Sequence, residues 1–189
     1  MSKAEQTRAR ILSKAAQLFN LRGYSGTSIS DIMQATDLEK GGIYNHFSSK
    51  DAIALAAFDH AYALQSEYYA EAIKAVKGQP TLQLRAVIDA FADGFTKPAI
   101  AGGCVIMNTA IESDDAHPAL RERAAKAMDE WNCLIQRIIA RGIDKGEFRR
   151  DIDPVALAGL IIAGLEGSLM MRKLYDDPVF IPHMADHLH

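Results

Sequence analysis

Apolar residues recur at spacings of three and four positions along most of the chain, and the strict alternation of a half-buried strand is almost absent. That spacing places apolar side chains on one face of a helix. Residues that favour helices, such as Ala, Leu, Glu and Lys, are also frequent. The pattern predicts an all-α protein of about nine helices.

Capping residues indicate where the first helices begin and end. Ser2-x-x-Glu5 is a possible capping box, and Gly23 is a C-terminal stop. Ser28-x-x-Asp31 caps a second, short helix, and after a turn at residues 36–37 a third is expected at residues 39–47. Prolines, glycines and a further cap, Ser48-x-x-Asp51, predict the remaining helices at about 48–77, 80–95, 104–113, 117–145, 153–175 and from 178 onward.

Charge is distributed unevenly, although the whole chain carries a formal net charge of only −3. Residues 1–50 hold seven Lys and Arg against four Asp and Glu, a balance of +3, and residues 51–189 carry −6. A basic N-terminal part favours contact between that part and a polyanion. Chance segregation is the other interpretation of so modest a difference. The composition, 49% apolar and 24% charged, is that of a globular protein.

Residues 7–47 have the layout of a helix-turn-helix motif, because two short helices with a tight turn between them follow a longer one. The second helix of such a motif can enter the major groove of DNA. A helix of about two turns is not stable alone, so neighbouring apolar side chains must hold it. The predicted core consists of Ile11, Phe19, Ile29, Ile32, Leu38, Ile43 and Phe47.

Within this stretch the residues themselves resemble a known family. The matching segments are Thr7-x-x-x-Ile11-x-x-x-Ala15-x-x-Leu18-Phe19, Arg22-Gly23-Tyr24, Thr27-Ser28-x-x-Asp31-Ile32 and Lys40-Gly41-Gly42-Ile43-Tyr44-Asn45-His46-Phe47-Ser48-Ser49-Lys50. In order and spacing they resemble the TetR family of bacterial transcriptional regulators. The resemblance implies a three-helix DNA-binding head at residues 1–50 on a helical ligand-binding and dimerisation body at residues 51–189.

The third expected helix carries residues that are chemically suited to reading DNA. The ammonium of Lys40 can reach a guanine edge or a phosphate, and Asn45 can bind a base edge, adenine being the usual partner. Gly41 and Gly42 have no side chains that would keep the backbone away from the duplex. Each glycine costs a helix about 1 kcal/mol relative to alanine, so two of them ask for a reason.

Five further residues complete the predicted DNA-binding set. The resemblance implies phosphate contacts for Tyr44, His46 and Lys50. Tyr44 could instead be only a packed aromatic side chain, and His46 only a solvated one. Thr27 and Ser28 are expected to cap the second helix and also to touch backbone phosphates.

The helix expected at 153–175 has a ridge of small residues three and four positions apart, which suits close approach of another helix. The predicted dimer interface is Ala156, Gly159, Leu160, Ala163 and Gly167. The helix before it offers an apolar stripe of Ala124, Ala127, Trp131, Leu134, Ile135 and Ile138. Two such helices from each of two copies would form a four-helix interface, which is also the family's usual dimer. The alternative is that both stripes are buried within one chain.

The resemblance also implies a small effector molecule bound among the middle helices. The candidate lining residues are Phe58, Tyr62, Phe91, Phe95, Cys104, Met107, Asn108, Glu112, Met128 and Trp131. As a set they suggest an apolar or aromatic ligand with a polar contact to Asn108 or Glu112. Each of them could equally be an ordinary core residue.

One short segment, Gly103-Cys104 followed by Asn108 and Glu112, resembles a branch of the family in which some members sense electrophiles or oxidants through a cysteine. A thiol near a helix N-terminus can have a lowered pKa and be reactive. The alternative is a buried, inert thiol.

No zinc-ligand spacing, phosphate-binding glycine loop or nucleophile motif is present in the sequence, which argues against an enzyme. We therefore expect no cofactor and no metal, and His183-x-x-x-His187, the best metal-like pair, is read as a solvated terminal segment. The longest unbroken apolar run, residues 155–165, is too short to span a bilayer. With a polar N-terminus this predicts a cytoplasmic protein without membrane contact.

Taken together, the sequence predicts a homodimeric repressor that occupies a palindromic operator in double-stranded DNA and leaves it when an effector binds. The alternative interpretation is a protein that coats DNA without sequence preference.

Overall fold

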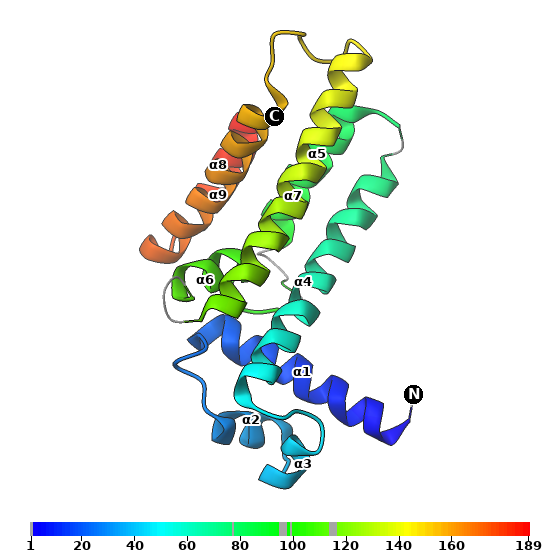
Figure 1. Cartoon of the computed structure of the whole chain (residues 1–189). Helices are drawn as coiled ribbons and strands as arrows, with labels where there is room; N and C mark the ends of the chain where they lie inside the picture. Colours follow the sequence, from blue (N-terminus) through cyan, green and yellow to red (C-terminus); the bar gives the residue numbers. More distant parts are fainter. Residues whose placement is uncertain (1, 77, 95–97, 99, 114–116) are drawn as a thin grey trace. The chain divides into compact units, whose positions relative to one another are not determined.

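The computed structural model describes residues 2–76, 78–94, 98, 100–113 and 117–189. Within these residues every regular element is an α-helix, so the predicted all-α fold is confirmed (Figure 1). The nine helices that they contain are α1 (Lys3–Arg22), α2 (Ile29–Thr36), α3 (Lys40–Tyr44), α4 (Lys50–Ala75), α5 (Pro80–Gly94), α6 (Val105–Glu112), α7 (Pro118–Asp144), α8 (Pro154–Tyr175) and α9 (Phe180–Leu188).

The predicted caps of α1 and α2 are confirmed. The side chains of Ser2 and Ser28 each accept a hydrogen bond from the backbone N–H three residues on. The acidic side chain at that position, Glu5 or Asp31, in turn accepts one from the backbone N–H of the serine. Gly23 ends α1 with a φ of 76°. Asp153 caps α8, with Pro154 in the first turn. These boundaries follow from local chemistry, because each cap satisfies an N–H that has no partner inside its helix.

Two local predictions are wrong. The third helix covers Lys40–Tyr44 and not residues 39–47, because the chain leaves helical geometry in a tight turn in which the N–H of His46 and of Phe47 both bond to Ile43 O. The cap of α4 is Ser49 and not Ser48, since Ser49 Oγ accepts from Ala52 N at 3.0 Å.

Contacts divide the chain into two compact units. Unit 1 comprises Met1–Leu64 and Ala99–Ala127, and unit 2 comprises Gln65–Pro98 and Met128–His189. The long helices α4 and α7 each contribute one part to each unit. The predicted division at residue 50 is a functional one and stays a prediction.

The core of unit 1 contains the apolar positions that were expected to hold the short helices. Ile11, Ile32 and Ile43 are fully buried and Phe47 nearly so. They come from α1, α2, α3 and the turn before α4, so one core fixes all of these elements. The other predicted core residues, Phe19, Ile29 and Leu38, are half-buried.

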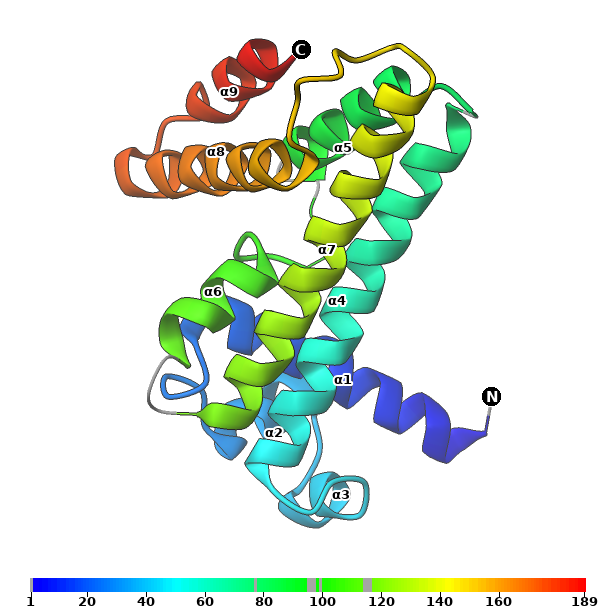
Figure 2. The ribbon, with the colours of Figure 1, turned by 45° about the horizontal axis from the view of Figure 1, so that its top comes forward.

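Unit 2 packs α8 against α9, and α9 against α5 (Figure 2). Its core includes Phe91, Ile135 and Leu165, all fully buried. α8 is 22 residues long and, contrary to the expectation from unbroken runs, is apolar enough to span a membrane by length and composition. Only 33% of its most apolar stretch is buried, so the helix exposes an apolar face.

Candidate nucleic-acid interface and effector region

Helices α2 and α3 form the predicted helix-turn-helix motif. Between them the chain turns at Asp37, which has a left-handed φ of 52°, and Leu38 N donates to Met33 O at 3.2 Å. The buried side chain of Ile43 anchors α3 from below. The motif is therefore held by the core of unit 1, as a helix of only five residues requires.

The outer face of α3 carries Lys40, Gly41 and Tyr44, and Asn45 follows as its C-cap residue; all four are exposed. Lys40 Nζ lies 5.9 Å from the centre of the Tyr44 ring. A Cβ atom at Gly41 would have nothing within 4 Å, and one at Gly42 would make only ordinary contact with Leu38. Neither glycine has a positive φ. Neither the backbone nor any neighbour in the described part of the chain therefore requires glycine at either position.

The residues predicted to bind phosphates differ in what they do. Lys50 Nζ lies 4.1 Å from the centre of the Tyr24 ring, and His46 is half-buried. Ser28 caps α2 as predicted. Thr27 does not share this cap, because its side chain is buried and its hydroxyl hydrogen-bonds to Gly23 O at 2.8 Å and to Leu18 O at 3.3 Å.

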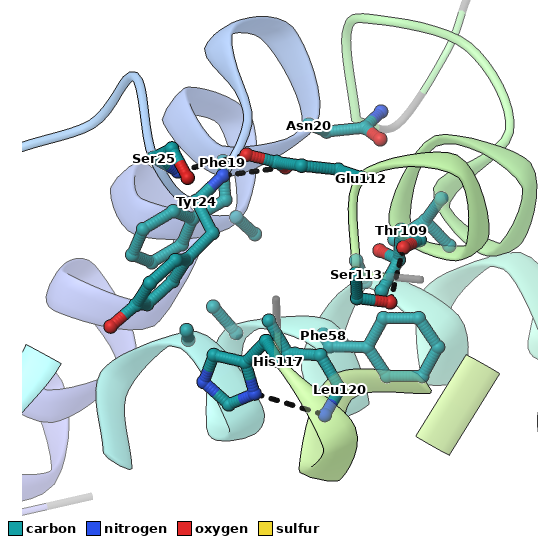
Figure 3. A pocket seen from close by; sticks show the side chains of 15 residues that line it. Phe19, Asn20, Tyr24, Ser25, Phe58, Thr109, Glu112, Ser113, His117 and Leu120 are labelled. Atoms are coloured by element: carbon teal, nitrogen blue, oxygen red, sulfur yellow. Dashed lines mark hydrogen bonds between the residues drawn. The ribbon is translucent and has the colours of Figure 1, made fainter. Parts of the chain in front are cut away.

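A cluster that the sequence did not single out lies at the start of α4. Tyr24 donates a hydrogen bond to Asp51, and burial, followed by this bond and the Asp51 charge, raises the pKa of Tyr24 to about 12. His117 Nε2 lies 3.7 Å from the same carboxylate, and its ring meets the Tyr24 ring edge-on at 4.8 Å. His117 Nδ1 accepts a hydrogen bond from Leu120 N at 3.2 Å (Figure 3).

The predicted effector residues fall into both units. Those of unit 1 are Phe58, Tyr62, Cys104, Met107, Asn108 and Glu112. Their two expected polar contacts are already engaged within the chain: Asn108 Nδ2 donates to Asn20 Oδ1 at 2.9 Å, and Glu112 accepts from Tyr24 N at 2.7 Å and Ser25 N at 2.8 Å. Tyr62 donates to Ala127 O at 3.3 Å.

The effector candidates of unit 2 are Phe91, Met128 and Trp131. Trp131 is stacked on Phe91 with ring centres 6.0 Å apart and on Tyr69 at 5.8 Å. Its buried Nε1 lacks a hydrogen-bond partner in the part of the chain that the structure describes. Met128 is half-buried, and Phe95 lies outside the described residues. The assignment of these residues to an effector stays a prediction.

Unit 1 contains a small cavity between α1, α4, α6 and the start of α7 (Figure 3). Its volume of about 40 Å³ suits water molecules rather than a larger effector. Of the predicted effector residues only Phe58 and Glu112 line it. Sequence reasoning missed Phe19, Tyr24 and His117, because no spacing rule brings residues so far apart in the chain to one wall.

Two other predictions concern titratable side chains. Cys104 lies immediately before α6 and is buried, so its proposed sensing role stays a prediction that requires a local opening. His183 and His187 are both exposed on α9. Among the described residues no group of three or more His, Cys, Asp and Glu side chains is placed to hold a metal ion.

The predicted interface on α8 lies largely on the surface of the single chain. Ala156, Gly159, Leu160 and Ala163 are exposed, and Gly167 is half-buried. The same face continues with exposed Val155, Met170, Leu174 and Tyr175.

The stripe on α7 behaves differently from the one on α8. Ala124, Ala127, Trp131, Ile135 and Ile138 are buried within their own chain, and Leu134 is half-buried. The expectation that this stripe joins a second copy is therefore wrong, and the alternative of burial within one chain holds for it.

Comparison with known proteins agrees with this architecture. Residues 11–57 match the family described as bacterial regulatory proteins, tetR family, and residues 80–188 match the tetracyclin repressor-like C-terminal domain. The crystal structure of a TetR transcriptional regulator from Chloroflexus aurantiacus J-10-fl is 45% identical, with a TM-score of 0.94 over 100% of this chain and 94% of that one.

Two curated relatives are transcriptional repressors by name. The HTH-type transcriptional repressor DhaR of Mycobacterium sp. strain GP1 is 27% identical over 88% of this chain and 82% of its own length. The repressor NemR of Escherichia coli K12 is 24% identical over 89% of this chain and 84% of its own length. These families comprise regulators and not enzymes. The protein belongs to the TetR family of helix-turn-helix transcriptional regulators.

Proposed function

We propose that the protein is a homodimeric repressor that binds a palindromic operator and releases it when an effector binds. The proposal rests on α3 and its C-cap, where the ammonium of Lys40, the hydroxyl of Tyr44 and the amide of Asn45 are exposed while Ile43 is buried in the core. Relatives named as repressors support the sign of regulation. The cytoplasm is the expected place of action.

In this proposal α3 is the helix that enters the major groove. Lys40 and Asn45 contact base edges, and Gly41 with Gly42 lets the backbone approach the duplex. The two glycines support this role because no contact among the described residues explains them. Close approach of the duplex backbone to α3 would offset their cost of about 1 kcal/mol each.

Phosphate contacts would come from around α3. Tyr44 is the last residue of α3, His46 and Lys50 follow it, and Ser28 caps α2. The buried hydroxyl of Thr27 would have to rotate away from its present partners to take part. Such contacts fix the register of the protein on the duplex and make the affinity depend on salt.

The exposed face of α8 is assigned to a second copy of the chain. Large apolar side chains exposed in a row mark an interface in a protein of this kind. Along this face Gly159 and Gly167 have nothing within 4 Å of an added Cβ, so another helix has room to approach closely. A two-fold dimer would present two α3 helices to two half-sites of a palindrome.

The effector would bind among the middle helices. In unit 2 the candidates are Phe91, Trp131 and Met128, and the buried Trp131 Nε1, which lacks a hydrogen-bond partner among the described residues, supports a ligand there. Phe58, Tyr62, Cys104, Met107, Asn108 and Glu112 belong to unit 1 and are retained as candidates. An effector would act by favouring a conformation with lower operator affinity.

Binding to DNA selected from a random pool tests the proposal. The full-length protein should prefer its selected duplex over random duplex by about 10³-fold or more. Lys50→Ala should weaken binding to all sequences and reduce the salt slope by about one. Lys40→Ala and Asn45→Ala should instead change the preferred base. Equal affinity for selected and random duplexes would support a DNA-coating protein and refute the repressor.

A further inference from the structure

A glutamate at the end of α6 is bound to the turn that leads into the helix-turn-helix motif. Glu112 Oε2 accepts from Tyr24 N at 2.7 Å, and Glu112 Oε1 accepts from Ser25 N at 2.8 Å (Figure 3). Both amides lie between the end of α1 and the start of α2. Hydrogen bonds to a charged acceptor are roughly twice as strong as neutral ones, so this contact is a firm attachment.

A second attachment is made one helical turn earlier on α6. Asn108 Nδ2 donates to Asn20 Oδ1 at 2.9 Å and to Asn20 O at 3.2 Å. Asn20 in turn donates to the carbonyls of Ala101 and Gly103, both at 2.9 Å, just before α6. Because Asn108 and Glu112 are four residues apart, one face of α6 contacts the last turn of α1 and the turn that follows.

Two glycines make this close approach possible. Gly23 has a φ of 76°, and a Cβ there would lie within 2.6 Å of the Glu112 carboxylate atoms. Gly102 has a φ of 110°, and a Cβ there would lie 2.6 Å from Asn20 O. Both positive φ values disfavour a side chain, and at Gly102 the nearby Asn20 backbone also leaves no space for one, whereas a side chain at Gly23 would displace the Glu112 carboxylate. Gly23 thus leaves room for the Glu112 contact, and Gly102 leaves room for the Asn20 contact.

We propose that Glu112, supported by Asn108, is a positioning residue for DNA binding: its carboxylate fixes the turn before α2 and so the orientation of the helix-turn-helix motif on α6. The inference rests on the proposed operator binding. Glu112 itself touches no DNA in this scheme. Its loss frees the amides of Tyr24 and Ser25 and lets α2 and α3 depart from the orientation that fits the groove.

The variant Glu112→Gln tests this in the full-length protein. The amide keeps the size of the side chain but offers one acceptor oxygen where the carboxylate offers two, and it brings a donor toward the second N–H. The matched control is Glu122→Gln, which removes the same charge from an exposed site on α7. Loss of a negative charge alone would favour DNA binding, so a loss of affinity in E112Q cannot come from net charge.

Two readouts are expected to move in E112Q and not in E122Q. Amide hydrogen exchange of Tyr24 and Ser25 without DNA should become at least about tenfold faster, because each N–H loses its partner or shares one. Affinity for the selected operator should fall by between about 5- and 100-fold, the usual range of coupling between sites. The salt slope should stay unchanged, since no phosphate contact is removed. A purely structural defect would instead lower the melting temperature and speed exchange throughout the core.

Glu112→Asp extends the test, and decides it if E112Q does not fold. Its carboxylate is one methylene shorter, so both exchange and affinity should lie between those of the wild type and a protein without the contact. The inference is overturned if exchange at Tyr24 and Ser25 rises while operator affinity stays within twofold of the control, or if exchange does not change. A wild-type protein that prefers no duplex overturns the proposed function instead, whereas normal wild-type binding with equal binding by E112Q overturns only this inference.

Discussion

The replacement Leu160→Ala on α8 is expected to weaken dimerisation measurably. Leu160 is 65% exposed in the single chain and stands in the middle of the exposed apolar face. If a second copy covers this face, the exposed part of the side chain leaves water when the dimer forms. The variant removes most of that apolar surface without touching the core of the chain.

The magnitude follows from the exposed fraction. Full burial of a leucine side chain contributes about 1.5–3 kcal/mol, so the 65% still exposed would contribute about 1–2 kcal/mol. Two-fold symmetry uses each residue twice, and the total is about 2–4 kcal/mol per dimer. Because alanine keeps one methyl group, the replacement should lose the lower part of this range, about 2–3 kcal/mol of dimerisation free energy. This corresponds to a roughly 30- to 140-fold higher dimer dissociation constant.

Sedimentation velocity over a dilution series measures that constant for the wild type and the variant. Leu21→Ala is the matched control, because Leu21 is 59% exposed but lies on α1. The control should dissociate like the wild type, and circular dichroism should show that both variants fold. If Leu160→Ala dissociates like Leu21→Ala, the assignment of α8 to the dimer is refuted.

Three further replacements test local features of the fold. Gly102→Ala should lower the free energy of unfolding in urea by about 1–3 kcal/mol or more, because its φ is 110° and the Asn20 carbonyl oxygen lies 2.6 Å from the new Cβ. The control Gly78→Ala, with a φ of 81° and open space around the new Cβ, should lower the free energy of unfolding by less. Tyr24→Phe should remove the tyrosine that ionises near pH 12 in an ultraviolet titration. Because the neutral form of Tyr24 is favoured in the folded state, it stabilises the fold below pH 10, and this stabilisation is lost as pH rises from 10 to about 12. A wild-type titration in which no tyrosine ionises near pH 12 contradicts the contact between Tyr24 and Asp51. Ser28→Ala should cost about 1 kcal/mol of helix capping. Since Ser28 lowers the pKa of Asp31 below its ordinary 3.8, the wild type should lose more stability than the variant as pH falls below that value, and equal acid profiles would argue against this bond.

Local sequence signals were sufficient for most helix boundaries. The caps at Ser2, Ser28 and Asp153 and the stop at Gly23 could be placed from neighbouring residues alone, because a cap joins atoms only a few positions apart. At the start of α4 two adjacent serines, Ser48 and Ser49, offer the same capping chemistry, and only the path of the chain selects Ser49.

The three-dimensional arrangement decided which apolar faces meet the chain's own core and which stay exposed. The stripes of α7 and α8 have the same helical period, yet that of α7 is buried and that of α8 is largely open. Periodicity reports that a face is apolar but not what covers it. The partners of Glu112 were equally hidden, because Tyr24 and Ser25 lie 88 and 87 positions away. The sequence by itself therefore determined the helices and the helix-turn-helix motif, whereas contacts between distant segments, which depend on how the helices pack, were settled only by the fold.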